Sequence, residues 1–313
     1  MKDLVSIVIP VYNRVTLISQ TIECAINQTY DQIEIVIIDN CSEDGTWEIL
    51  TQYTLLDNRI SLFRNEQNIG PVRNWIRCVT KTRGKYVKIL FSDDVMLPTF
   101  VEETISVFDS DVAFVLGRIE IFNNHGTLRH DNFNDLKSLS TEDYIQDIIL
   151  LNRLGLPVSP SAALFRREDM INALVIEIPN PEGLVNERYG AGNDLFIYLL
   201  IAKNYNRVVF TNSYLIKFRD HEASFTSSND LEIYYLYSKL HFLKNYHTVL
   251  LNKFCTLLFL KQIFNLKYSK IYEYSPQILS YKYMMILIAV KIKNKLMKLF
   301  IHKSLMNKSK KDG

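Results

Sequence analysis

Short apolar runs alternate with longer stretches of mixed polarity over the first 95 residues of the chain. The apolar runs occupy 5–9, 33–38, 60–63 and 85–91, and each stops at a polar residue or a proline. Runs of this length, bounded in this way, are typical of β-strands. Because they are nearly continuous instead of alternating with polar positions, we expect strands that are buried on both faces of a parallel sheet.

The stretches between these runs carry helix signals. Thr16 is a candidate N-cap for a helix that reaches Ile26, a Cys-Ser-Glu-Asp-Gly turn precedes a helix over 46–55, and Pro71 suits the first turn of a helix before Gly84. Strands that alternate with helices predict an α/β fold, with a doubly wound, mostly parallel, Rossmann-like sheet and flanking helices.

The middle of the chain is less regular. We expect strands at 112–118, 162–165 and 207–210, and helices over 141–151 and from about residue 194. The asparagine-rich stretch from 123 to 134 is predicted to be a loop.

The composition changes after residue 230. The segment 231–313 contains 15 Lys, no Arg and three acidic residues, a net charge of +12, whereas residues 1–230 carry 21 basic and 31 acidic residues, a net charge of −10. Within it, apolar residues over 281–300 recur at helical spacing. We therefore predict one domain at 1–230 and a helical, basic extension at 231–313 that contacts an anionic surface, with solvated lysines on packed helices as the alternative.

Cysteine usage and hydropathy bear on the compartment. The four cysteines form no C-x-x-C pair, which favours reduced thiols in a cytoplasmic protein. The sequence shows no signal peptide and no apolar run near the roughly 18–20 residues that span a bilayer.

Two adjacent carboxylates, Asp93 and Asp94, follow the apolar run at 85–91. They repel each other unless a cation or a hydrogen-bond donor lies beside them. The carboxyl ends of strands in an open α/β sheet are where ligands bind. Mg²⁺ or Mn²⁺, held by one or two carboxylates and by substrate phosphates, would suit this position.

Seven short motifs in a fixed order resemble the inverting GT-A glycosyltransferases of the family 2 type, over about residues 3–225. They are Val5-Ser-Ile-Val-Ile-Pro-Val-Tyr-Asn-Arg14, Glu34-Ile-Val-Ile-Ile-Asp-Asn-Cys-Ser-Glu-Asp-Gly-Thr46, Asn68-Ile-Gly70, Gly84-Lys-Tyr-Val87, Leu90-Phe-Ser-Asp-Asp94, Gly192-Asn-Asp194 and Arg219-Asp-His221. The resemblance implies a GT-A fold and transfer of a sugar from a nucleotide donor in the synthesis of a bacterial surface polysaccharide, such as O-antigen or capsule.

The resemblance also implies a set of donor-binding residues. Asp39 would accept the imide N–H of a uracil or thymine base, since an ionised carboxylate only accepts hydrogen bonds. Its alternative role is to cap the turn that follows it. The other members of the set are Pro10, Tyr12, Asn68, Gly70, Arg73 and Asp93.

The resemblance assigns a Mn²⁺ or Mg²⁺ cofactor to Asp94 and His221, and the general base to Asp194, whose alternative role is a helix cap. Two positions depart from the family pattern. Phe91 replaces an acidic residue two positions before Asp93, which bears on how the ribose or a second metal contact is held. Asn193 replaces an acidic residue beside the expected base.

We therefore expect a metal-dependent hexosyltransferase that uses a UDP-sugar and a glycan or lipid-linked glycan acceptor at the cytoplasmic face of the inner membrane. A catalytically inactive nucleotide-sugar-binding scaffold is the alternative that the two departures leave open. A nucleotidyltransferase would need a glycine-rich, basic first loop, and Pro10-Val-Tyr-Asn13 is not one. The tail lacks Arg, so no nucleic-acid partner is expected.

Overall fold

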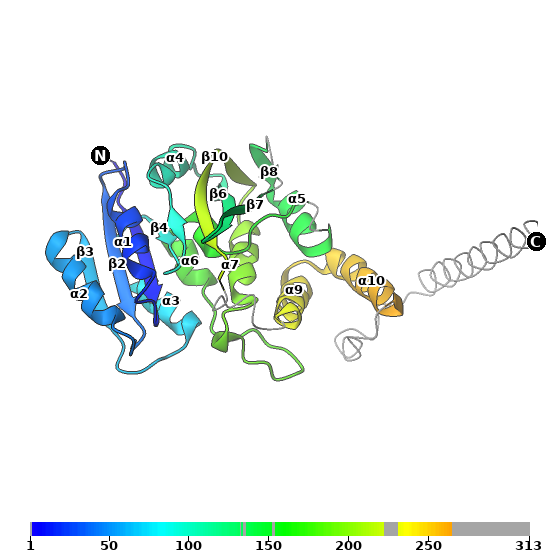
Figure 1. Cartoon of the computed structure of the whole chain (residues 1–313). Coiled ribbons are helices and arrows are strands. Elements are labelled where there is room, and N and C mark those ends of the chain that lie inside the picture. Colours follow the sequence, from blue (N-terminus) through cyan, green and yellow to red (C-terminus); the bar gives the residue numbers. More distant parts are fainter. Residues whose placement is uncertain (1, 132, 134–135, 152–153, 222–230, 265–313) are drawn as a thin grey trace, which may run out of the picture. The chain divides into compact units, whose positions relative to one another are not determined.

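The computed structural model describes residues 2–131, 133, 136–151, 154–221 and 231–264 (Figure 1). Its contacts divide the chain into two compact units, Met1–Tyr246 and His247–Gly313. The predicted boundary lay at residue 230, whereas the first compact unit also contains the helix α9 (Glu232–Tyr246).

The first unit is built on one ten-stranded sheet. Its main path runs in the order β3 (Ile60–Arg64), β2 (Ile33–Asp39), β1 (Val5–Val11), β4 (Tyr86–Ile89), β9 (Ala163–Arg166), β6 (Val112–Asn123), β10 (Arg207–Arg219) and β5 (Val95–Met96). The strands from β3 to β4 are parallel, as are β6 and β10, while β9 and β5 are antiparallel to their neighbours. Two further strands, β7 (Gly126–His130) and β8 (Ser138–Ser140), pair with β6 and β10.

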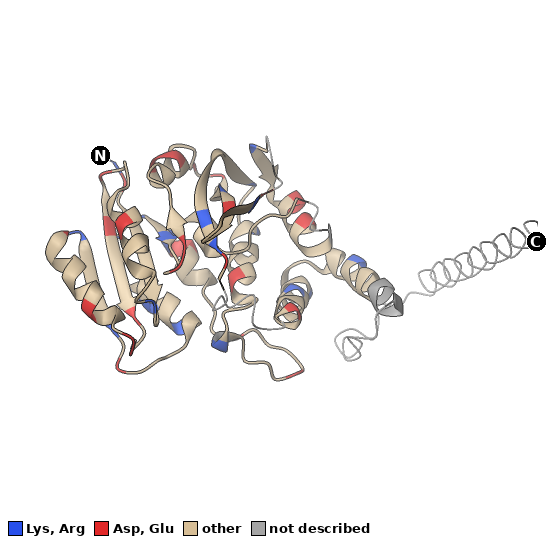
Figure 2. Ribbon diagram, in the orientation of Figure 1, with Lys and Arg blue, Asp and Glu red and all other residues tan. Residues whose placement is uncertain are grey.

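Helices cover this sheet, which confirms the predicted mostly parallel α/β architecture. The helix α1 (Ile18–Ile26) packs against α2 (Thr46–Leu56). The helix α6 (Arg167–Ala173) packs against both α3 (Pro71–Thr80) and α7 (Asn193–Ala202). The shorter helices are α4 (Phe100–Ser106) and α5 (Thr141–Gln146). A π-helix over Asp147–Leu151 continues α5. Every residue of β1 and β2 is buried, as their continuous apolar sequences predicted. Figure 2 shows the charged residues, which lie on helices and loops and also on strands such as β2 and β10.

Pro10 does not end the first strand, contrary to the sequence expectation. β1 continues to Val11, with Pro10 opposite Ile38 of β2. The Val8 carbonyl accepts a hydrogen bond from the Leu90 N–H, so Val8 and Pro10 face β4. Since β4 ends at Ile89, the N–H that proline lacks costs the sheet no hydrogen bond.

An aromatic cluster forms the core beneath β6. The Phe114 ring lies 4.8 Å from Tyr198, 5.2 Å from Tyr144 and 5.7 Å from Phe165, measured between ring centroids. All four side chains are fully buried, and burial of each stabilises the fold by roughly 1.5–3 kcal/mol. Tyr198 belongs to α7, so this cluster anchors the helix that carries Asp194.

The pairing of β5 with β10 joins two distant segments of the chain. Met96 lies opposite Ile216 and Val95 opposite Lys217. Asp93 and Asp94 are the two residues before β5, and Arg219 ends β10. This short pairing therefore brings residues 219–221 to the turn after β4.

The C-terminal extension begins as helix, as predicted. The helix α9 is part of the first unit, and α10 (Thr248–Phe264) belongs to the second. The amphipathic segment predicted at 281–300 lies outside the described residues. Within the described ranges, no helix has both the length and the hydrophobicity that crossing a bilayer requires.

Candidate active site

The carboxylate pair lies in a tight turn after β4. The Asp94 N–H donates to the Phe91 carbonyl at 3.0 Å, and the Thr21 hydroxyl donates to the Asp94 carbonyl at 3.1 Å. The two side chains have different surroundings: Asp93 is partly exposed, whereas Asp94 is buried. The turn therefore leaves one carboxylate accessible to solvent and keeps the other inside the protein.

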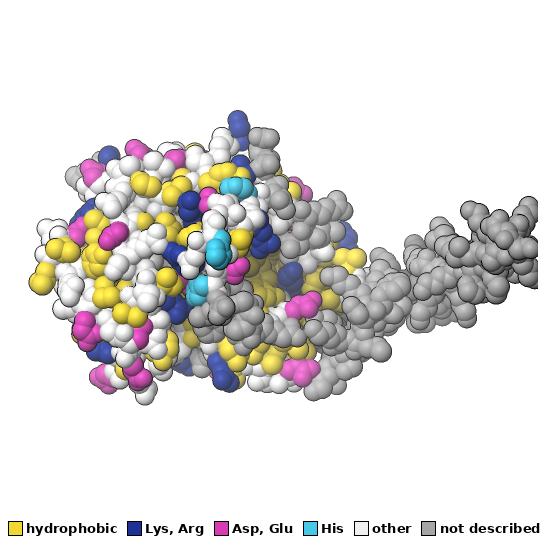
Figure 3. Space-filling model, viewed as in Figure 1, with side chains coloured by type: hydrophobic (Ala, Val, Ile, Leu, Met, Phe, Trp, Pro, Cys, Tyr) yellow, Lys and Arg dark blue, Asp and Glu magenta, His cyan; other side chains and the backbone are white. Residues whose placement is uncertain are grey.

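Three cationic or basic groups surround Asp93. His221 Nε2 lies 3.2 Å from Asp93 Oδ2, and an Arg14 guanidinium nitrogen lies 3.6 Å from the same oxygen. The Arg219 Nε–H donates to the Asp93 carbonyl at 3.1 Å. Figure 3 shows histidine, lysine and arginine side chains gathered on the face over β7 and β10. The polar groups around Asp93 are suited to an anionic ligand such as a diphosphate.

Asp94 lies in a different environment. Burial raises its pKa to about 8, the neighbouring Asp93 charge adds to the rise, and the Lys88 charge opposes it. Lys88 is fully buried, donates to the Ser161 carbonyl and lies 4.2 Å from the centroid of the Phe100 ring. Burial lowers the pKa of the Lys88 ammonium to about 7. The sequence paired Asp94 with His221, but the structure places the imidazole beside Asp93.

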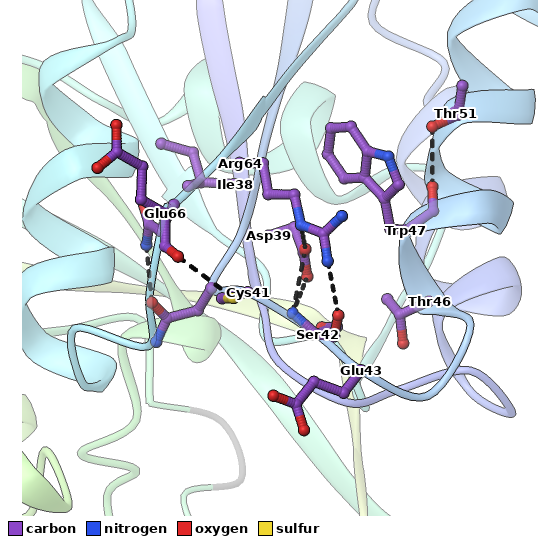
Figure 4. Close-up of polar contacts among 12 residues, drawn as sticks. Ile38, Asp39, Cys41, Ser42, Glu43, Thr46, Trp47, Thr51, Arg64 and Glu66 are labelled. Carbon is purple, nitrogen blue, oxygen red and sulfur yellow. Dashed lines mark hydrogen bonds and ion pairs between the residues drawn. The ribbon is translucent and has the colours of Figure 1, made fainter.

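Asp39 ends β2 and is fully buried. Both of its carboxylate oxygens lie 3.2 Å from the Ser42 N–H, and Oδ2 lies 3.1 Å from Arg64 Nε (Figure 4). The Arg64 guanidinium also donates to the Ser42 carbonyl at 2.7 Å and lies 5.0 Å from the Trp47 ring centroid. The turn-capping role that the sequence left open for Asp39 is therefore present in the structure. Arg64, which sequence analysis had not singled out, holds the carboxylate from its other side.

The other residues that the sequence predicted to bind the nucleotide-sugar donor lie at the same edge of the sheet. Pro10 is buried in β1, and Tyr12, which follows the strand, is 40% exposed. The amide oxygen of Asn68 accepts from Asn40 Nδ2 at 2.8 Å and from the Gly70 N–H at 2.9 Å.

Gly70 has a φ of +81°, which favours glycine, and it directly precedes α3. Arg73 is exposed in the first turn of that helix. Since β1, β2 and β4 are parallel, their carboxyl ends bring all these groups to one edge.

Asp194 lies in the first turn of α7 and is partly buried. Its Oδ1 accepts from the Gly192 N–H at 2.9 Å and the Leu195 N–H at 2.7 Å, and its Oδ2 accepts from the Tyr235 hydroxyl at 2.6 Å. Burial raises the pKa of Asp194 to about 7, although these hydrogen bonds oppose the rise. A carboxylate with such a pKa exchanges a proton readily at neutral pH.

The structure gives a reason for the amide at position 193. Asn193 Nδ2 donates to the Val175 carbonyl at 2.7 Å and to the Ile176 carbonyl at 3.3 Å. A carboxylate cannot donate hydrogen bonds, so an acidic residue could not make these contacts. Asn193 thus fixes the 175–176 loop, and Asp194 is left as the carboxylate of this motif.

The described residues contain no group of three or more His, Cys, Asp and Glu side chains that could hold a metal ion. Asp93 and His221 are two side chains of these types in contact, with His221 Nε2 3.2 Å from Asp93 Oδ2. A pair of protein ligands is compatible with Mg²⁺ or Mn²⁺ when substrate phosphates supply further oxygens.

Comparison with known proteins decides the family. The model of glycosyl transferase family 2 matches residues 6–172. The chain belongs to this family.

Named glycosyltransferases match about a third to a half of this chain. A putative teichuronic acid biosynthesis glycosyltransferase of Bacillus subtilis, TuaG, is 29% identical over 150 residues, which cover 48% of this chain and 60% of the relative. The Escherichia coli UDP-Glc:alpha-D-GlcNAc-diphosphoundecaprenol beta-1,3-glucosyltransferase WfaP is 36% identical over 115 residues, 36% of this chain and 44% of the relative. The matches thus span less than two thirds of these relatives.

Solved structures support the GT-A fold. Staphylococcus aureus TarS 1–349 in complex with UDP-GlcNAc has a TM-score of 0.65 at 18% identity, over 86% of this chain and 77% of the 1–349 chain. GalNAc-T7 with UDP, GalNAc and Mn²⁺ has a TM-score of 0.59 at 15% identity, over 94% of this chain and 58% of GalNAc-T7.

Asp194→Asn is expected to stabilise the protein in a pH-dependent way. The folded-state pKa of about 7 exceeds the ordinary value of about 3.9, so ionising Asp194 costs stability increasingly as pH rises from about 4 to 7. Asparagine can keep the Gly192 and Leu195 hydrogen bonds without the charge. We expect a gain of about 1–3 kcal/mol in the free energy of unfolding at pH 8, and little gain near pH 4. Urea unfolding at the two pH values measures this difference, and an equal gain at both would contradict it.

Proposed function

We propose that the protein is an inverting, metal-dependent glycosyltransferase that moves a sugar from a UDP-sugar to a hydroxyl group of a glycan. The observation that carries the proposal is the convergence of His221, Arg14 and Arg219 on Asp93, at the carboxyl edge of the sheet. A departing diphosphate needs such a concentration of neutralising groups, because negative charge develops on its oxygens as the glycosidic bond breaks.

The donor nucleotide would occupy the edge formed by the ends of β1 and β2. Asp39 is fixed by Arg64 and Ser42, and its remaining acceptor capacity can receive the uracil imide N–H. Pro10 and Tyr12 would form the wall beside the base and ribose. Asn68, Gly70 and Arg73, at the start of α3, lie where backbone N–H groups and the helix dipole favour an anion.

Asp93 and His221 would hold Mn²⁺ or Mg²⁺. The donor set fits, since a carboxylate oxygen and an imidazole nitrogen 3.2 Å apart can bind one ion while substrate phosphates complete its coordination. When bound, the ion would supply Lewis-acid stabilisation of the diphosphate. The sequence predicted Asp94 and His221 as the metal ligands. We propose Asp93 in place of Asp94, because His221 contacts Asp93. Arg14 lies beside this pair, and its buried Nε, among the described residues, has no hydrogen-bond partner.

Asp194 would act as the general base. It would accept the proton of the acceptor hydroxyl as that oxygen attacks the anomeric carbon from the face opposite the diphosphate. The attack inverts the anomeric configuration, and the bonding electrons of the broken bond leave with UDP. The raised pKa of Asp194 matches it to this role at neutral pH.

The acceptor is proposed to be a lipid-linked glycan of a bacterial surface polysaccharide. WfaP, by its name, acts on a sugar linked through diphosphate to undecaprenol, and TuaG is named for teichuronic acid biosynthesis. A lipid-linked acceptor would place the enzyme at a membrane surface. The lysine-rich segment 231–313, with a net charge of +12, would then bind the anionic headgroups.

Removal of divalent metal and the Asp93→Asn substitution should each abolish most turnover. Either change leaves the charge on the diphosphate less neutralised, and we expect a loss of about 100-fold or more. The assay is release of UDP from UDP-glucose and UDP-N-acetylglucosamine, with Mn²⁺ and with EDTA.

Asp31→Asn, an exposed change far from the site, is the control for this experiment. Asp94→Asn, assayed in parallel, tests the choice between the two carboxylates, and a larger loss from it than from Asp93→Asn would return the metal to Asp94. Full turnover in EDTA would refute the metal role.

Asp194→Asn should lower kcat by about 10²–10⁴-fold and leave the donor KM unchanged, since the base acts on the acceptor hydroxyl. Transfer to a lipid-linked glycan acceptor measures kcat, and calorimetric titration with UDP confirms donor binding. The exposed Glu232→Gln is the control. Retained transfer by Asp194→Asn would assign the base elsewhere, and UDP binding without turnover by the unaltered protein would favour a scaffold.

The full-length protein should sediment with vesicles that contain phosphatidylglycerol but not with vesicles of phosphatidylcholine alone. The lysine-rich segment gains roughly 1 kcal/mol per lysine near an anionic surface, and salt screens this attraction. We therefore expect release at about 0.5 M salt. Equal retention on both vesicle types would refute the electrostatic membrane contact.

A further inference from the structure

The helix α9 packs on the helix that carries the proposed base. Phe196 of α7 lies 6.4 Å from Phe242 and 5.7 Å from His241 between ring centroids. On another side, the Lys239 ammonium donates to the Ile148 carbonyl at 2.7 Å. α9 therefore has a fixed position in the catalytic unit, although its composition suggested a separate tail.

The contact continues into the loop before the base. Gly192 has a φ of +82°, and a Cβ atom there would lie 2.8 Å from the Tyr234 carbonyl oxygen and would also collide with the Ser238 hydroxyl. The backbone at position 192 is thus pressed directly against α9. This close approach requires glycine in the Gly-Asn-Asp motif.

One residue after Tyr234, the Tyr235 hydroxyl reaches Asp194 Oδ2 at 2.6 Å. The other oxygen, Oδ1, is held by the Gly192 and Leu195 N–H groups. A hydrogen bond to each oxygen fixes the rotation of the carboxylate, and Oδ2 keeps a lone pair for the acceptor hydroxyl.

We propose that Tyr235 is a positioning residue for the general base, so that α9 completes the catalytic site. The proposal rests on Asp194 acting as the base. In the transfer step the acceptor O–H bond breaks and its proton passes to Asp194, the new bond forms between that oxygen and the anomeric carbon, and the bond to UDP breaks with its electron pair on UDP. Tyr235 keeps its proton throughout and orients the carboxylate that receives one.

A titration at this position near neutral pH can be assigned to the Asp194 carboxyl group, because the groups around it do not titrate there. Among the described residues, Tyr235 of α9 and Tyr198 of α7 interact with it electrostatically, and burial raises the pKa of both phenols above the ordinary value. Both phenols are therefore neutral at pH 7. Within the described part of the chain Asp194 has no ion-pair partner, so a proton exchanged near neutral pH belongs to the carboxylate.

The test is Tyr235→Phe in the full-length protein, with Tyr234→Phe as the matched control. Tyr234 loses the same hydroxyl one residue away, and its ring packs 5.6 Å from Tyr189 instead of reaching Asp194. The first readout is the pKa of Asp194, measured by ¹³C NMR of carboxyl-labelled aspartate, with Asp194→Asn used to assign the signal.

The Tyr235 hydroxyl favours the ionised carboxylate, so its removal should raise the pKa of Asp194 by about one unit. Tyr234→Phe should leave it unchanged. An unchanged pKa in Tyr235→Phe would overturn the proposal, whether or not the protein transfers sugar.

The second readout is the pH dependence of sugar transfer. In Tyr235→Phe, kcat at pH 7 should fall about tenfold with the donor KM unchanged, and the acid limb of the profile should move to higher pH. A loss that is equal at all pH values and accompanied by a lower Tm would show a purely structural role and would overturn the proposal. If the unaltered protein transfers no sugar, the proposed function fails, while the NMR shift still reports on the Tyr235–Asp194 contact.

Discussion

The antiparallel pairing of β5 with β10 is the constraint on which the proposed site depends. It is short, since β5 has two residues, yet it brings Arg219 and His221 to the turn that contains Asp93. The long parallel alignment of β10 with β6 supports it. Without this pairing Arg219 and His221 would lie apart from Asp93, and the proposed diphosphate site would not form.

The four carboxylates of the proposed site differ because their surroundings differ. Asp39 pairs with Arg64, Asp93 faces His221 and Arg14, and Asp94 is buried near Lys88. Asp194 is partly buried among hydrogen-bond donors, with no ion pair to a cation in the part of the chain that the structure describes. Opposite charge favours the ionised form and burial opposes it. One residue type can therefore serve in the three proposed roles of nucleotide contact, metal ligand and proton acceptor.

Burial of Asp194 also sets a cost in stability. A carboxylate with a raised pKa destabilises the folded state at neutral pH, and such strain is common at sites that need a poised proton acceptor. The surrounding structure offsets this cost. The aromatic cluster around Phe114 and Tyr198 anchors α7. The helix α9 packs against Gly192 at Tyr234 and Ser238, and its Phe242 packs on Phe196 of α7.

The sequence by itself determined the parallel strands, the family and the acidic motifs, because hydrophobic runs and turn residues act through local conformation and are visible in a linear pattern. It did not determine which carboxylate meets His221, that Arg64 supports Asp39, or that Tyr235 reaches Asp194 from 41 residues along the chain. Those contacts join segments that only packing brings together. Periodicity shows that a helix such as α9 has an apolar face, but which helix that face covers depends on the folded neighbours. The tertiary structure alone decided that α9 belongs to the catalytic unit.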